Sequence, residues 1–308
     1  MKITYLKNKD IDFVKWDHCI NNAHNGNIYA FSWYLDIICE EWEALVHDDY
    51  EAVMPIVHKK KAKFRYTYTD ILSQQLGVFS TDLLDEQMVN AFVKKLAEVY
   101  PLFTVNLNKY NKLTPSLFGQ EQKTTYEFDL IGSYESVRRN YSEEVREAVN
   151  GAKKEKITVI KNIRPNDFLN LVQGTNVMAT SRPGRDEINR LRRIIAFVLR
   201  HGLGEIYVAY TPENNLCAAC LFLKSNRKTN VLYSAITRDG LSLNAMHFLM
   251  DYYIKKHTER ILTLNFENLV IPDREEFCEG FGGQPFHYLN VFNNQLPFFQ
   301  QLIFKWLR

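Results

Sequence analysis

The feature that most limits the fold is an order of elements that occurs twice along the chain. In each copy an apolar strand is followed by a basic turn, a second strand, an amphipathic helix and a short closing strand. The first copy covers residues 50–108 and the second residues 216–266. A helix between two strands of one sheet implies a right-handed crossover and a locally parallel pair. We therefore predict two related α/β halves, although such units also occur in unduplicated α/β proteins.

The two copies match element by element. In the first, the strand 50–57 precedes a basic turn at 58–63 and an aromatic, β-branched run at 64–79. The helix 82–100 has Met88, Phe92, Leu96 and Val99 at helical spacing, and Pro101 ends it before the strand 102–108. The second has strands at 216–223, 231–237 and 261–266, a basic turn at 225–230 and a helix at 244–256.

A helix-rich segment separates the copies. We predict a helix at 134–154, a strand at 157–160, helices at 166–173 and 185–201, and a strand at 205–210. The helix 134–154 places Val137, Tyr141, Val145 and Val149 on one face, and Gly202 ends the helix 185–201. Helices, then antiparallel strands, then a β-α-β unit is the running order of a GNAT acyltransferase domain.

Composition excludes several classes of protein. The net charge of the 308 residues is +2, so no global field draws the chain to nucleic acid or an anionic membrane. The five cysteines are scattered, which favours a reducing compartment over a disulfide framework. The first residues lack an apolar core, and no apolar stretch reaches the roughly 18–20 residues that span a bilayer. We expect a cytoplasmic protein without a transmembrane segment.

Three stretches in the C-terminal half carry a family resemblance. Residues 141–154 (YSEEVREAVNGAKK) are similar to a Tyr-Ser-rich, Arg-centred helix, and residues 264–268 (LNFEN) to a strand ending in Asp-Phe-Glu-Gly. Residues 277–288 (FCEGFGGQPFHY) resemble a Phe-x-x-x-Phe-Gly motif followed by a Tyr, and Met54-Pro55 and residues 74–77 (QQLG) add to the likeness. The chain resembles the Fem-like, double-GNAT branch of the GNAT superfamily, which is related to the peptidoglycan aminoacyltransferases that build cell-wall cross-bridges.

This resemblance implies an α/β (α+β) chain of two tandem GNAT-like domains, each a mixed sheet flanked by helices. We place them at residues 1–130 and 131–308, the second being catalytic. The sequence departs from the family where the acid at the strand end is Asn265 and the Gly-Ser pair is Asn268-Leu269. Those changes imply a different substrate or weakened catalysis. The long helical hairpin that some Fem proteins insert, and that is linked to tRNA, has no room here.

The resemblance also indicates where a donor would bind. Backbone amides and a helix N-terminus favour the pyrophosphate of acyl-CoA. Residues 237–245 lie between a strand and a helix, and Arg238, Gly240, Ser242 and Asn244 are the candidate CoA-binding residues. The alternative is an ordinary turn with Ser242 as a helix N-cap. The first interpretation predicts that Gly240→Val abolishes acyl-CoA binding and leaves the fold intact.

An amine acceptor must lose a proton as it attacks, so a base is needed. Glu267 follows the closing strand at the rim where β-α-β sheets bind ligands, and we predict that it accepts the proton or binds the amine. A surface glutamate is the alternative. Tyr233 and Tyr288 are candidate catalytic donors to the leaving group. The candidate substrate-binding residues are Arg182, Arg185, Gln74 and Tyr68.

Other motifs favour structural interpretations. The arginines between 182 and 200 either grip phosphates of a nucleotide, lipid or RNA, or form a solvated helix face. Cys217 and Cys220 have redox spacing but lie in an apolar strand, which favours core packing. The eight histidines show no metal-ligand spacing and we treat them as structural or surface residues, so we predict no metal site. A phosphate-binding Gly-Lys-Ser/Thr loop is also missing from the sequence.

The leading hypothesis is an N-acyltransferase. It would move an acetyl or aminoacyl group from acetyl-CoA, another acyl-CoA or aminoacyl-tRNA to an amine on a small molecule or cell-envelope precursor. Of these donors, tRNA is the less favoured. The first alternative is a non-catalytic ligand-binding protein that keeps the GNAT fold, motivated by Asn265 and Asn268-Leu269. The second is an RNA-associated factor that uses the arginine-rich helix.

Overall fold

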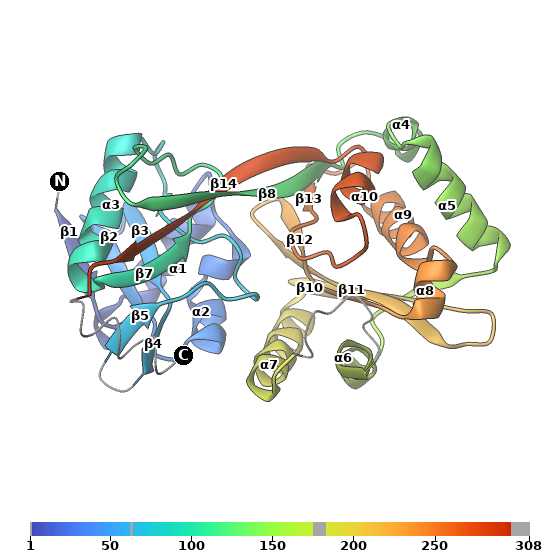
Figure 1. The fold of residues 1–308 in the computed structure, drawn as a ribbon, viewed down its shortest axis with the longest axis horizontal. Coiled ribbons are helices and arrows are strands. Elements are labelled where there is room, and N and C mark those ends of the chain that lie inside the picture. The colour runs from blue at the N-terminus through green and yellow to red at the C-terminus, as the bar shows by residue number, and fades with distance from the viewer. Residues whose placement is uncertain (1, 62–63, 175–182, 297–308) are drawn as a thin grey trace. The chain divides into compact units, whose positions relative to one another are not determined.

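The computed structural model describes residues 2–61, 64–174 and 183–296, which form two compact units (Figure 1). Unit 1 comprises residues 1–124 and 287–308, and unit 2 comprises residues 125–286. The prediction assigned residues 287–308 to the C-terminal domain, and the described part of this segment instead belongs to unit 1. The reason is the last strand, β14 (Gln284–Asn294), which pairs with a strand of unit 1 from Asn290 to Asn294.

Unit 1 has two α-helices between the first two strands of its sheet, a hairpin between the third and fourth strands, and then one long helix. Its helices are α1 (Phe13–Asn22), α2 (Ser32–Ile38) and α3 (Glu86–Val99). Its strands are β1 (Ile3–Leu6), β2 (Glu43–His47), β3 (Ala52–Ile56), β4 (His58–Lys61), β5 (Phe64–Thr67), β6 (Phe79–Ser80), β7 (Leu102–Asn106) and the first part of β8 (Gly119–Asp129). Strands β1, β2, β3 and β6 form one antiparallel sheet in that order, and β7 pairs antiparallel with β14.

The first repeat copy differs from its prediction in two places. Most of the expected basic turn is strand β4, which pairs antiparallel with β5. The expected parallel pair before and after α3 is reduced to one bridge, between Leu76 and Leu107. The helix itself is confirmed, and Asp85 caps it by accepting a hydrogen bond from the Met88 amide (2.7 Å). Its buried face consists of Val89, Phe92, Val93 and Leu96, so Met88 and Val99 lie at the edge of that face.

Unit 2 is one mixed sheet with helices on both faces (Figure 1). Its helices are α4 (Tyr134–Arg139), α5 (Glu143–Lys154), α6 (Pro165–Gly174), α7 (Arg185–His201), α8 (Arg238–Ser242), α9 (Ala245–His257) and α10 (Arg274–Gly280). Its strands are β9 (Thr158–Lys161), β10 (Gly204–Tyr210), β11 (Leu216–Ser225), β12 (Lys228–Ile236) and β13 (Thr263–Asn265), with the second part of β8. The sheet order is β8-β13-β12-β11-β10-β9.

The second repeat copy is confirmed at its crossover. Strands β12 and β13 are parallel over three residue pairs, from Lys228–Thr263 to Asn230–Asn265, and α9 connects them. The other described pairings within this sheet are antiparallel. Helices α6 and α7 pack on one face of the sheet and α5 and α9 on the other (Figure 1). The predicted mixed α/β architecture with sheets flanked by helices is therefore observed.

Local sequence explains the helices that cover unit 2. Five apolar residues of α7 are buried at helical spacing, namely Ile188, Leu191, Ile194, Ile195 and Val198, and Gly202 ends the helix with a left-handed φ of 69°. The predicted helix 134–154 is broken at residues 140–142. Ser142 caps a new helix there, because its side chain accepts a hydrogen bond from the Val145 amide (3.2 Å). The predicted apolar face, Val137, Tyr141, Val145 and Val149, is buried across the break.

Membrane-spanning segments were sought among the described helices. None of them combines the length and the apolar character needed to cross a bilayer.

Candidate functional site

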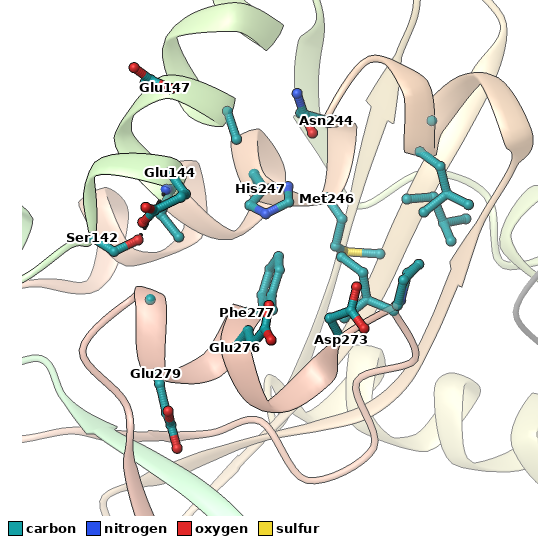
Figure 2. A pocket seen from close by; sticks show the side chains of 18 residues that line it. Ser142, Glu144, Glu147, Asn244, Met246, His247, Asp273, Glu276, Phe277 and Glu279 are labelled. Atoms are coloured by element: carbon teal, nitrogen blue, oxygen red, sulfur yellow. Dashed lines mark hydrogen bonds between the residues drawn. The ribbon is translucent and has the colours of Figure 1, made fainter.

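A large hollow lies within unit 2, where α5, α9 and α10 begin on the same face of the sheet. Its volume is about 1010 Å³. In Figure 2, His247 and Phe277 lie in the middle of the lining, with Ser142 and Glu144 on one side and Met246 and Asp273 on the other, whereas Glu147 and Glu279 extend away from this centre. The polar and charged members of its lining are Ser142, Glu144, Glu147, Asn244, His247, Asp273, Glu276 and Glu279. Because every lining residue belongs to unit 2, the hollow is complete within that unit.

His247 is the only imidazole in the lining of this hollow. It lies in the first turn of α9 and is half-buried, and its ring packs against Phe277 with centroids 4.6 Å apart. Burial lowers the pKa of His247 from its ordinary 6.5 to about 4, because the surroundings cannot solvate the charged form. The imidazole is therefore neutral at pH 7. Neither ring nitrogen hydrogen-bonds to a described protein group, so a proton acceptor is available in the hollow.

Carboxylates line the hollow around His247. Five are present, Glu144, Glu147, Asp273, Glu276 and Glu279, and all five residues are exposed. A backbone amide at the start of α5 and the Ser142 hydroxyl lower the pKa of Glu144, which keeps that carboxylate ionised. The lining contains no Lys or Arg. The hollow therefore attracts cations, and the attraction is screened over about 8 Å at physiological salt.

The predicted donor loop borders this hollow and is partly hydrogen-bonded within itself. Residues 238–242 form the short helix α8, and its N-cap is Thr237 rather than Ser242. The Gly240 amide donates to the Thr237 hydroxyl (3.0 Å), and the Leu241 and Leu243 amides donate to the carbonyls of Thr237 and Asp239. These three amides are therefore engaged within the loop.

The four candidate CoA-binding residues have separate environments. Gly240 and Asn244 line the hollow, whereas Arg238 and Ser242 do not. Ser242 is exposed and its hydroxyl donates to the Asp239 carbonyl (3.0 Å). A Cβ on Gly240 would lie 2.2 Å from the Cys217 carbonyl oxygen, so this glycine permits α8 to pack on β11. We therefore expect Gly240→Val to disturb the packing of α8 on β11 rather than to leave the fold intact.

The predicted catalytic residues of unit 2 lie outside the hollow lining. Glu267 follows β13 and is buried, which excludes the alternative of a surface glutamate. The backbone carbonyl of Glu267 accepts a hydrogen bond from the Arg274 guanidinium (3.0 Å). Tyr233 donates to a Glu187 carboxylate oxygen (2.9 Å) on α7, and burial, followed by this carboxylate, raises the Tyr233 pKa. Tyr233 thus faces α7, on the side of the sheet opposite the hollow (Figure 1).

Asn265, where the family has an acid, is held in a buried polar chain. The Thr125 hydroxyl donates to its side-chain oxygen (2.6 Å), and its amide donates to Glu127 (3.4 Å). Both contacts join β13 to β8 across the sheet. The Asn265 amide therefore links β13 to β8.

The remaining predicted site residues lie in unit 1 or at the start of α7. Tyr288 and Gln74 are brought together in unit 1, where the Tyr288 hydroxyl is 3.4 Å from the Gln74 side-chain oxygen. The Lys59 ammonium lies over the Tyr68 ring, 4.0 Å from its centroid. Arg185 is exposed at the first position of α7. Arg182 lies outside the described residues. The assignments of these residues to catalysis or binding stay predictions.

Two other motifs have structural surroundings. Cys217 and Cys220 are buried, and burial raises the pKa of Cys217 to about 11. A β-bulge between Ala209 and Tyr210 lets both cysteines join the core on the α9 face, although residues three apart in a regular strand face opposite ways.

On α7, Arg192, Arg193 and Arg200 are exposed, as expected of a solvated helix face.

Sequence reasoning missed His247 and the carboxylate lining. His247 was treated like the other histidines as structural, although it lies three residues after Asn244 of the candidate loop. That spacing places both on one face of a helix and was the signal available. The carboxylates come from α5 and α10, more than 120 residues apart in sequence, so only the fold could bring them together.

Comparisons with known proteins extend the fold assignment. No family model matches the chain, and no curated protein matches it. Among solved structures, FemX is similar over 100% of both chains, with a TM-score of 0.64 and 13% identity. A protein of unknown function from Bacteroides thetaiotaomicron is similar over 95% of this chain and 100% of its own, with a TM-score of 0.55 and 13% identity.

A third similar structure is the C-terminal domain of a putative lysylphosphatidylglycerol synthetase from Agrobacterium fabrum. It covers 96% of this chain and 95% of its own, with a TM-score of 0.50 and 9% identity. At these identities the likeness establishes the fold alone. The chain has a fold like that of FemX, in agreement with the Fem-like resemblance of its sequence.

Proposed function

We propose that this chain is an acyltransferase that moves an acyl group from an activated ester or thioester to an amine, and that the hollow of unit 2 holds the amine. The observation that carries the proposal is the neutral His247 beside five carboxylates, on a fold like that of FemX. The carboxylates attract a protonated amine, and the apolar floor around Phe277 excludes water from its carbon chain.

The bound ammonium ion first loses one proton to solvent, because only the free amine is a nucleophile. Its nitrogen then forms a bond to the acyl carbon and loses a second proton to a base, while the carbon–sulfur or carbon–oxygen bond to the donor breaks and the departing thiolate or alkoxide takes up a proton. The N–H protons become much more acidic as the carbon–nitrogen bond forms, so a neutral imidazole is a competent acceptor at that stage. His247 is suited to this role because burial keeps it unprotonated at pH 7.

The same charges argue against a donor pyrophosphate in this hollow. A pyrophosphate needs backbone donors or cationic side chains, and the lining offers five carboxylates without Lys or Arg. The loop amides at residues 240–244 already hydrogen-bond within the loop. We therefore assign Gly240 and Asn244 to the acceptor side, and propose that acyl-CoA or aminoacyl-tRNA is held elsewhere. The Fem-like resemblance supports a cell-envelope precursor as the source of the amine.

A second candidate function is non-catalytic binding of a cationic ligand. Asn265 favours it, because the side chain that replaces the family acid is committed to Thr125 and Glu127. A binding protein of this kind would hold its cationic ligand with the same carboxylates and would not need His247 as a base.

Binding and turnover together separate these functions. Thermal unfolding is measured with cadaverine as an amine probe, with acetyl-CoA and with free CoA, and transfer is assayed from acetyl-CoA and from mixed aminoacyl-tRNA to cadaverine. A bound ligand at a hundredfold excess over its Kd stabilises the fold by about 2.7 kcal/mol. The proposal expects amine stabilisation together with product from one donor. Amine stabilisation without product from either donor would favour the non-catalytic protein, and no amine stabilisation would contradict both.

A further inference from the structure

A second cluster of potential ligands lies in unit 1, at the turn that joins β2 to β3. His47 ends β2, Asp48 begins the turn and Glu51 ends it. One ligand atom from each of these residues lies within 4.8 Å of the other two. The cluster belongs to unit 1 and shares no residue with the hollow of unit 2. It is therefore independent of the proposed acyl transfer.

The His47 ring is buried, and one of its nitrogen atoms has no hydrogen-bond partner in the described part of the chain. The residue is only 9% exposed, and its Nδ1 atom is buried without a hydrogen-bond partner in the described part of the chain. Nδ1 lies 3.9 Å from a Glu51 carboxylate oxygen, and Nε2 lies 3.5 Å from an Asp48 carboxylate oxygen. Both distances exceed the 2.7–3.2 Å of an N–H···O hydrogen bond. A histidine–carboxylate ion pair alone therefore leaves Nδ1 unsatisfied.

A metal ion would satisfy it. Two ligands about 2.0 Å from a tetrahedral Zn²⁺ ion lie roughly 3.3 Å apart, and the Glu51 oxygen is 3.9 Å from His47 Nδ1 on a side chain that is 61% exposed, so a small side-chain movement brings both atoms into coordination. Asp48 supplies a second carboxylate, and its side chain is 52% exposed, so solvent can complete the coordination. Imidazole with carboxylates suits Zn²⁺, which binds such sites more tightly than Mn²⁺ or Fe²⁺.

We propose that His47, Asp48 and Glu51 bind one Zn²⁺ ion at the β2–β3 turn. The ion would join the end of β2 to the start of β3 and neutralise two adjacent carboxylates. The sequence prediction of no metal site rested on spacing, and this spacing of i, i+1 and i+4 across a turn resembles none of the usual zinc patterns.

Calorimetric titration tests the proposal on the full-length, tag-free protein after removal of metal with a chelator. The wild type is expected to bind one Zn²⁺, and His47→Gln and Glu51→Gln are each expected to weaken binding at least about tenfold, or about 1.4 kcal/mol. Two matched controls should leave the affinity unchanged. Asp49→Asn removes the adjacent carboxylate, which pairs with Lys15 and lies outside the cluster, and His18→Gln removes an exposed histidine of α1.

Folding of each variant is checked by circular dichroism. Glu51 and Asp48 have side chains 61% and 52% exposed, so Glu51→Gln and Asp48→Asn decide the matter if the buried His47→Gln does not fold. The proposal is overturned if the wild type shows no saturable binding of one ion, or if Glu51→Gln and Asp48→Asn bind as tightly as the wild type. Equal weakening by Asp49→Asn would also overturn it, because it would indicate diffuse attraction to the acidic turn.

Discussion

The two units differ at the start of helices α3 and α9. In unit 1, Asp85 caps α3, because its side chain accepts a hydrogen bond from the Met88 amide (2.7 Å). In unit 2, Asn244 precedes α9 in a left-handed conformation without a side-chain cap, and a hollow of about 1010 Å³ adjoins it. Unit 1 thus caps this helix start with a side chain, whereas unit 2 leaves it uncapped beside ionisable groups.

Buried polar groups differ in the same way. In unit 1 the side-chain amides of Asn25, Asn108 and Asn111 all donate to the Val78 carbonyl, at 2.8, 3.2 and 2.9 Å. These three amides are committed to the backbone. In unit 2, neither ring nitrogen of His247 hydrogen-bonds to a described protein group. Under the proposed function, acyl transfer therefore belongs to unit 2.

Substitutions of buried phenylalanines, for which we expect the largest effects on stability, test whether each unit has its own core. Phe92 in unit 1 and Phe222 in unit 2 are fully buried, and Phe222 stacks on Tyr253 with centroids 3.6 Å apart. We expect Phe92→Ala and Phe222→Ala each to lower the free energy of unfolding by about 3–5 kcal/mol. Hydrogen exchange measured by mass spectrometry should rise mainly in the unit that carries the change. Equal increases in both units would show that the cores are not independent.

Substituting Gly240 in unit 2 and Gly77 in unit 1 tests two places where a side chain would collide with a neighbouring oxygen atom. A Cβ at Gly240 would lie 2.2 Å from the Cys217 carbonyl oxygen, and one at Gly77 would lie 2.2 Å from the Asn111 side-chain oxygen, where φ is 88°. We expect Gly240→Val and Gly77→Val each to cost about 1–3 kcal/mol of unfolding free energy, measured with urea. A wild-type midpoint for Gly240→Val would show that α8 can move away from β11.

Acid should destabilise unit 2 through His247. Its folded pKa is about 4 and its ordinary value 6.5, so the unfolded chain binds a proton in this interval that the folded chain does not. Stability attributable to His247 is complete above about pH 6.5 and is lost as pH falls to about 4. Urea titrations at pH 7 and pH 5 should therefore show a smaller loss for His247→Gln than for the wild type. Identical losses would mean that the ring is better solvated than the structure indicates.

The smallest expected effect lies on α5, beside the hollow. A Cβ at Gly151 would meet no atom within 4 Å, and this glycine sits inside the helix. Gly151→Ala should raise the unfolding free energy by about 0.5–1 kcal/mol, because alanine loses less backbone entropy on folding. Thermal unfolding measures it, and a loss of stability would indicate a contact at this face that the structure does not contain.

Much of the fold was predictable because local signals agreed with it. The apolar spacing of α7 and its ending at Gly202, and the crossover from β12 through α9 to β13, all follow from residues close together in sequence. The return of β14 to unit 1 was not predictable, because its pairing with β7 joins residues more than 180 positions apart. The break at Ser142 was missed because the apolar stripe continues across it.

The candidate site was predicted only in part. Gly240 and Asn244 were found because they lie between a strand and a helix, which is a local signal. Glu267 was chosen by its position at a strand end and Tyr233 because it lies one strand earlier, but the direction of each side chain depends on packing that sequence does not contain. His247 could not be separated from the other histidines without knowing that Phe277 packs against its ring.

Steady-state transfer by His247→Gln, with the donor–amine pair that the wild type uses, tests the central claim most directly. Glutamine keeps the approximate size and polarity of the side chain and removes the base. The account predicts a loss of about 10²–10⁴-fold in kcat, the usual contribution of a positioned general base, with amine binding unchanged. Transfer at the wild-type rate by a folded His247→Gln protein would contradict the account and remove the hollow of unit 2 from the chemistry.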